Sequence, residues 1–176
     1  SACDIAIATD DEIDLFVNDG LGSATPSATH PMLGLIESSL CACGSGTGPA
    51  TRLAFLLEDG HVGQIDPGSA PVFSPTSLLQ GLGTLRADSH LVAGDVDGDG
   101  VTDLVVLVAV DRQGGAVDRQ LVLLRGTTSG LDPFAWELPD PSAWTAISAE
   151  VSDLVLGDFA PADPAHHREV ALAVPR

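Results

Sequence analysis

The stretch 95–103 reads Asp-Val-Asp-Gly-Asp-Gly-Val-Thr-Asp and places acidic residues at its first, third, fifth and ninth positions. Four carboxylates this close repel one another unless a cation lies between them. Gly98 and Gly100 allow the positive φ angles of a tight wrap, and oxygen ligands favour Ca²⁺ over Zn²⁺ or Cu²⁺. The alternative is an acidic turn that holds no metal. The predicted calcium ligands are Asp95, Asp97, Asp99, the carbonyl of Val101, and Asp103.

The residues around this loop argue against an EF-hand. An EF-hand loop carries a bidentate acid at its twelfth position and is flanked by helices. Here the twelfth position is Val106, inside the apolar run 104–110, which is rich in β-branched residues. This run and the segment 91–93 are typical of buried strands. The loop is therefore expected to join two strands.

The composition indicates one folded, all-β domain. The chain has 176 residues, of which 44% are hydrophobic, and its mean hydropathy is +0.25. No apolar run approaches the roughly 18 residues of a membrane span, and no signal-like segment is present. We expect a soluble chain that is either processed or excised from something longer. Its 19 glycines and 12 prolines interrupt short apolar segments, which favours strands over helices.

The charge is strongly negative. There are 25 acidic residues against seven basic ones, all seven of them arginine, and the formal net charge is -18. Such a surface repels nucleic acid and anionic lipid, so neither is an expected partner. Metal loops account for part of the acidity, and a salty or extracellular habitat is a second source. The expected location is extracellular or at the cell surface.

Three cysteines, Cys3, Cys41 and Cys43, are too few for a disulfide framework. Cys41 and Cys43 are too close for a relaxed bridge with each other, so the possible disulfide joins Cys3 to one of them. A soft-metal site at the Cys-x-Cys pair is the alternative, but the sequence places no further ligand near it. The disulfide state therefore stays open.

The sequence contains an internal repeat. Similar apolar segments, each followed by a turn and in the first three cases by a second strand, recur at intervals of roughly 50 residues or more. A Gly/Ser-rich segment ending in proline then follows. The segments begin at Asp4, Arg52, Asp103 and Glu169, and the prolines are Pro26, Pro71 and Pro133. The repeats are expected at approximately 1–40, 41–87, 88–150 and 151–176, the last incomplete.

A repeat of roughly 50 residues with about four short strands is typical of a propeller blade. The stretch 94–106, GDVDGDGVTDLVV, resembles the FG-GAP or VCBS-type repeat of integrin-like β-propellers. The resemblance is close over about 88–135 and looser elsewhere. It implies an all-β fold of three to four propeller blades, Ca²⁺ bound by the 95–103 loop, and ligand-binding loops on one face.

The equivalent loops depart from this pattern. In the segment 44–52 the four acids are replaced by three glycines and Arg52. No calcium is expected there, and the guanidinium of Arg52 is expected to bond loop carbonyls instead. The last loop keeps an acid at Asp158 and has Glu169 at its end, with Asp163 between them. Because that loop is longer than 95–103, a weak or absent site is expected.

Three repeats and a remainder are fewer than the roughly four to eight blades of a closed propeller. An open array exposes strand edges, which invite pairing with another chain. The chain is therefore expected to be part of a larger propeller. Either the remaining blades of the same protein or a second polypeptide would complete it.

Signals of catalysis are weak. The chain has no tyrosine, no nucleophile elbow and no phosphate-binding glycine loop. Its two tryptophans either pack between blades or stack on a sugar, and its histidines are interpreted as solvated loop residues rather than as a ligand set. These residues are Trp136, Trp144, His30, His61, His90, His166 and His167.

Two functions follow from these observations. The favoured one is a calcium-stabilised binding or scaffold module for a protein or a glycan, with no catalytic residue of its own. The alternative is the propeller portion of a carbohydrate-active enzyme whose catalytic residues lie outside this chain.

Overall fold

The structure is a computed structural model of the whole chain. It describes residues 5–9, 11–36, 39–43, 52–65, 69–74, 77–79, 84–111, 115–126, 145–147, 151, 153–157 and 169–173. Within these ranges the regular elements are all β-strands, and no α-helix occurs. The prediction of an all-β chain is confirmed.

The strands form four antiparallel sheets, named here by their order in the chain. The first sheet contains β1 (Ile5–Ala8), β2 (Glu12–Asn18) and β3 (Ala24–Pro31). The second contains β4 (Cys41–Cys43), β5 (Arg52–Leu56), β6 (Val62–Ile65) and β7 (Val72–Phe73). The third contains β8 (His90–Gly94), β9 (Asp103–Asp111), β10 (Val117–Leu124) and β11 (Thr145–Ala146). The fourth contains β12 (Asp153–Gly157) and β13 (Glu169–Ala173).

Each sheet is a meander, because the order of its strands in space is their order in the chain. Every pairing between named strands joins neighbours in the sequence, so short connections suffice to build each sheet. Each sheet also lies inside one of the four repeat ranges expected from the sequence. The assignment of these ranges as propeller blades stays a prediction.

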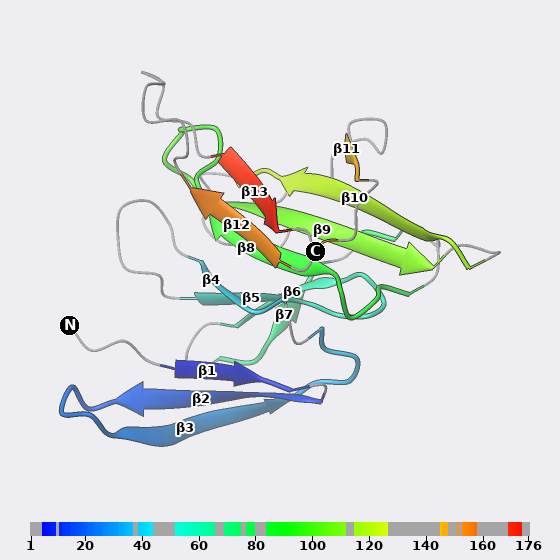
Figure 1. Cartoon of the computed structure of the whole chain (residues 1–176). Coiled ribbons are helices and arrows are strands. Elements are labelled where there is room, and N and C mark those ends of the chain that lie inside the picture. The colour runs from blue at the N-terminus through cyan, green and yellow to red at the C-terminus, as the bar shows by residue number, and fades with distance from the viewer. Residues whose placement is uncertain are drawn as a thin grey trace.

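Successive sheets pack face to face through shared apolar clusters. In Figure 1 the first sheet lies at the bottom, the second lies above it, and the third and fourth occupy the upper part. The central strand β9 shows the consequence of this stacking. Leu104 and Val106 pack in a cluster with residues of the second sheet, whereas Val105 and Leu107 pack with the fourth. Both faces of β9 are buried, which explains why its sequence is a continuous apolar run rather than an alternating one.

The second sheet has the same two-sided packing. Phe55 contacts the first sheet through a cluster that includes Ile13, and Leu56 contacts the third through a cluster that includes Leu104. Successive side chains of a strand point to opposite faces, so one strand can serve both interfaces. Also, β8 lies beside both β4 and β12, so the first strands of three consecutive sheets adjoin one another.

The apolar segments singled out in the sequence are strands. The elements β1, β5 and β13 cover 5–8, 52–56 and 169–173, and β9 covers the run 104–110. The segment before Pro26 differs from the expectation of a Gly/Ser-rich connection, because Pro26 lies inside β3. It pairs with Phe16 at a β-bulge, on a strand at the edge of the described sheet. An edge strand and a bulge are the places where a sheet tolerates a residue without an N–H.

Gly63 on β6 is a point of close packing in the second sheet. It lies opposite Phe55, whose ring covers it, and a Cβ atom at position 63 would overlap that ring. The same ring meets Phe73 edge to face, with centroids 6.0 Å apart and an interplanar angle of 85°. Because Phe55 is fully buried, its ring has little room to move.

We therefore expect Gly63→Ala to destabilise the protein by about 1 to 3 kcal/mol through overpacking. Urea unfolding followed by circular dichroism measures this change. Gly63→Ala should cost less stability in a Phe55→Leu background than in wild type, because the smaller leucine leaves room for the added methyl group. An unchanged unfolding midpoint in Gly63→Ala would contradict the packing described.

Four charged residues form an ionic cluster at the end of the third sheet opposite the 95–103 loop. They are Arg86, Asp88, Asp111 and Arg119. The two oxygens of the Asp88 carboxylate accept hydrogen bonds from Arg86 Nε at 2.8 Å and Arg119 Nη2 at 2.7 Å. Arg86 also donates to Asp111 at the end of β9, at 2.7 Å. Burial acts to raise the pKa of Asp88, but the hydrogen bonds and positive charges of Arg119 and Arg86 outweigh it and hold the pKa below its usual value.

The lowered pKa of Asp88 makes its contribution to stability dependent on pH. A carboxylate with a depressed folded-state pKa stabilises the fold above its unfolded-state value, near 4, and loses that effect as the pH falls through the folded-state value. We expect Asp88→Asn to lower the free energy of unfolding at pH 7 by about 1 kcal/mol. The difference from wild type should shrink as the pH falls below about 4. Urea titrations from pH 7 to pH 2.5 test this, with the exposed Asp11→Asn as control.

Candidate metal site

The connection between β8 and β9 folds as a tight acidic turn. The strands separate at the pair formed by Gly94 and Asp103, and the turn lies between these residues. Gly98 and Gly100 adopt φ angles of 80° and 84°, as the sequence predicted. Residues with a Cβ atom rarely adopt such angles, so both glycines serve the wrap of the backbone.

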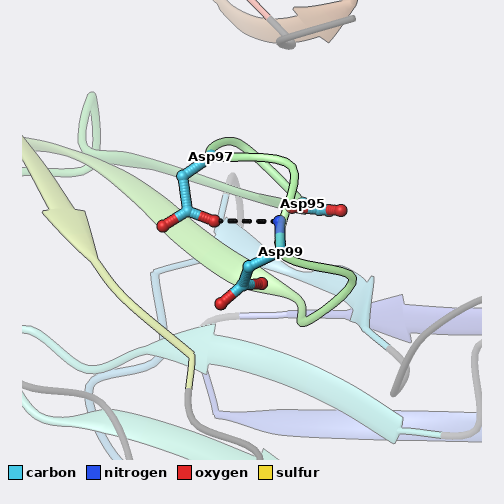
Figure 2. A group of neighbouring side chains, drawn as sticks. All are labelled: Asp95, Asp97 and Asp99. Carbon is cyan, nitrogen blue, oxygen red and sulfur yellow. Dashed lines mark hydrogen bonds between the residues drawn. The ribbon is translucent and has the colours of Figure 1, made fainter. Parts of the chain in front are cut away.

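Three of the five predicted ligands gather in this turn. Asp95, Asp97 and Asp99 each offer a carboxylate oxygen, and these oxygens lie within 4.8 Å of one another. Figure 2 shows the three side chains on one short stretch of backbone. In the part of the chain that the structure describes, this triad is the only group of three or more His, Cys, Asp or Glu residues close enough to share a metal ion.

Backbone N–H groups hold the three carboxylates in place. Asp95 accepts hydrogen bonds from the N–H of Gly98 at 2.8 Å and of Gly100 at 2.9 Å. Asp99 accepts one from the N–H of Val101 at 2.7 Å, and Asp97 accepts a longer one, at 3.3 Å, from the N–H of Asp99 (Figure 2). A carboxylate has about four lone-pair sites, so these bonds leave acceptor capacity for a cation.

The electrostatics of the triad favour a hard cation. Two unit charges at 4.8 Å repel each other by about 1 kcal/mol at the dielectric constant of water, and three such pairs arise when all three groups are ionised. A divalent cation among them converts this repulsion into attraction. The donors are all carboxylate oxygens, without histidine or cysteine, and this donor set fits Ca²⁺ or Mg²⁺ rather than Zn²⁺.

Asp103 has a different position from the triad. Its side chain is buried, and its two carboxylate oxygens accept the N–H of Val96 at 2.9 Å and of Gly126 at 2.8 Å. Burial raises the pKa of Asp103; the bonds from Gly126 and Val96 act against this, and the charges of Asp97 and Asp99 add to it. In this structure Asp103 anchors the turn to the segment after β10, and its role as a ligand stays a prediction.

Gly126 also contributes to the site, although it lies outside the 95–103 motif. Its N–H reaches Asp103 because the backbone passes very close to the carbonyl of Thr102, where a Cβ atom at position 126 would overlap. The sequence carries a signal for this residue, since Gly126 directly follows the strand residues 120–124 and Arg125. A glycine at this place indicates that another backbone segment passes close by, but the sequence does not show which segment it is.

The remaining predicted features are placed only in part. Val101 directs its N–H to Asp99, and the predicted use of its carbonyl as a ligand is untested. Arg52 begins β5, while 44–51 lies outside the described residues, so the expectation of a metal-free loop there is untested. The same holds for the last loop, because 158–168 lies outside the described ranges.

The other residues weighed in the sequence form no second site in the described part of the chain. The imidazole Nδ1 of His61 lies 2.9 Å from the carboxylate of Asp59, which is two residues away in the turn between β5 and β6. The interpretation of the histidines as solvated loop residues is wrong for two of them, because His30 lies on β3 and His90 begins β8, and both are partly buried. The pair 166–167, both tryptophans and Cys3 are outside the described residues, so their predicted roles and the disulfide remain open.

Comparisons with protein-family models, with curated proteins and with solved structures give no match to this chain. The resemblance to FG-GAP or VCBS repeats therefore depends on the residues 94–106 and their repeat context alone. Among the described residues, no helix has the length and apolar character needed to cross a membrane.

The geometry predicts opposite roles for Asp103 and Asp97 in the absence of metal. Asp103→Asn should destabilise the metal-free protein by about 1 to 3 kcal/mol, because its amide group can accept only one of the two partly buried N–H bonds that the carboxylate accepts. Asp97→Asn should leave the stability unchanged or raise it slightly, because it relieves repulsion within the triad. Urea unfolding in the presence of a chelator measures both. Equal losses of unfolding free energy in the two variants would contradict the assignment of Asp103 as the anchor of the turn and of Asp97 as a member of the triad.

Proposed function

We propose that this chain is a calcium-stabilised β-propeller module that binds a protein or a glycan, of the type that the FG-GAP and VCBS repeats represent. The observation that carries the proposal is the convergence of Asp95, Asp97 and Asp99 in a glycine-wrapped turn between two strands. These three are among the five residues that match the repeat pattern position by position, the others being Val101 and Asp103.

The arrangement of the sheets supports the propeller part of the proposal. Successive four-stranded meanders, such as β4 to β7 and β8 to β11, are the unit from which propellers are built. Packing of these sheets face to face, with β4, β8 and β12 side by side, is the arrangement expected of blades around an axis. On this proposal β4, β8 and β12 are the strands nearest the axis.

In the proposed site, Asp95, Asp97 and Asp99 hold the ion and Asp103 holds the turn. When bound, Ca²⁺ would supply positive charge and fix the relative positions of the three carboxylates. The backbone bonds described above already orient these side chains, so binding requires little rearrangement of the turn. The rigid turn then presents the loop that leaves β8 as part of a binding surface.

The exposure of the site indicates the class of calcium affinity. Asp99 is exposed, Asp95 and Asp97 are partly exposed, and three carboxylates are few for a high-affinity site. Extracellular calcium modules have dissociation constants of about 0.1 to 1 mM, and we place this site in that range. Such a site is filled where calcium is abundant, which agrees with the proposed extracellular or cell-surface location.

The site is expected to bind one Ca²⁺ and to lose at least tenfold in affinity in Asp97→Asn, because the variant lacks one ligand charge. Calorimetric titration with CaCl₂ measures the affinity, and the rise in melting temperature with calcium provides an independent readout. Asp14→Asn on β2 is the matched control, since it removes the same charge far from the turn. If Asp97→Asn and wild type bind calcium equally, the proposed site is wrong.

A further inference from the structure

An aliphatic side chain of the acidic turn packs into the protein. Val96 lies between Asp95 and Asp97 and is partly buried, whereas the tip of the turn at 98–100 is exposed. Its side chain packs against an apolar cluster that the third and fourth sheets share. The turn therefore contributes a side chain to the contact between these two sheets. The buried members of the cluster are Val105, Leu107, Val151 and Leu154.

The backbone of Val96 is tied to the third sheet as well. Its N–H donates to one oxygen of the buried Asp103 carboxylate at 2.9 Å, and the other oxygen accepts the N–H of Gly126. Val96 shares its two peptide units with Asp95 and Asp97, and peptide units are planar and rigid. A displacement of either acidic residue is therefore passed to Val96. A closely packed cluster transmits such a displacement instead of absorbing it.

Electrostatic repulsion acts on the two neighbours of Val96. The carboxylate oxygens of the triad lie within 4.8 Å of one another, so ionised Asp95 and Asp97 repel each other on either side of this residue. The loss of one charge, screening by salt, or a cation between the carboxylates relieves the repulsion.

We propose that the charge of the acidic turn is coupled, through Val96, to the docking of the fourth sheet on the third. Relief of the repulsion seats Val96 on the shared cluster and strengthens the docking, and the full charge weakens it. This effect of charge needs no metal. The inference rests on the proposed function in one respect only, which is that Ca²⁺ bound by the triad would then regulate the contact between the two sheets.

Val92 on β8 provides a matched control. It is partly buried and packs against the same cluster, but it lies on the strand before the turn and not between two acids of the triad. Val92→Ala and Val96→Ala remove the same methyl groups from the cluster, so both should weaken the docking of the fourth sheet. Only Val96→Ala should also remove the dependence of the docking on charge.

Amide hydrogen exchange followed by mass spectrometry measures the opening of the fourth sheet. The exchange rates of the backbone amides of β12 and β13 are compared at low ionic strength with a chelator present. Asp97→Asn should slow this exchange about threefold relative to wild type. Wild type in about 0.5 M NaCl should change in the same direction, and this measurement needs no substitution in the turn. Peptides from the first sheet, which packs in a separate cluster, are the internal reference.

The two valine variants then locate the coupling. In a Val96→Ala background the effect of Asp97→Asn should fall to about 1.5-fold or less, whereas in a Val92→Ala background it should stay near threefold. Saturating CaCl₂ should slow the exchange of the wild type at least about fivefold and show the same dependence on Val96.

Equal effects of Asp97→Asn in the two valine backgrounds would overturn the proposal. Exchange in β12 and β13 that responds neither to Asp97→Asn nor to salt would do the same. Failure of the calcium site has a different signature. If calorimetry detects no calcium binding while Asp97→Asn still slows the exchange through Val96, the coupling holds and the proposed function is wrong.

Discussion

The packing of apolar side chains between successive sheets is the interaction on which the rest of the structure depends. An open sheet cannot cover its own two faces, and both faces of β9 are covered because the second and fourth sheets lie on either side of it. Burial of this kind contributes about 25 cal/mol for each Å² of apolar surface removed from water. The position of the acidic turn follows from it, because Asp103 is the first residue of β9 and is fixed with that strand.

Much of the local structure could be predicted from sequence, since it depends on neighbouring residues. Runs such as 52–56 and 104–110 indicated strands, and the spacing of Gly98 and Gly100 indicated the wrap of the turn. The role of Asp103 was less accessible. Its spacing matched a ligand, yet its two oxygens accept N–H groups, one of them from Gly126, 23 residues later in the chain. The spacing of residues within one loop does not reveal a hydrogen-bond donor that comes from a distant part of the chain.

Pro26 illustrates a second limit of the sequence. A proline in a Gly/Ser-rich stretch is typical of a connection, and here tertiary context makes the segment an edge strand with a bulge. The order of the sheets was also beyond local patterns. An apolar run indicates burial on two sides, but the identity of the two neighbours depends on how whole sheets dock, which only the three-dimensional arrangement shows.

The meander order of each sheet has a consequence for how the chain folds. Pairing only between consecutive strands keeps the sequence separation of contacts within a sheet small, and low contact order speeds the formation of such units. Docking between adjacent sheets then adds stability as in a linear array, where each unit depends mainly on its neighbours. Amide hydrogen exchange should accordingly be slowest in the two inner sheets and faster toward both ends of the stack.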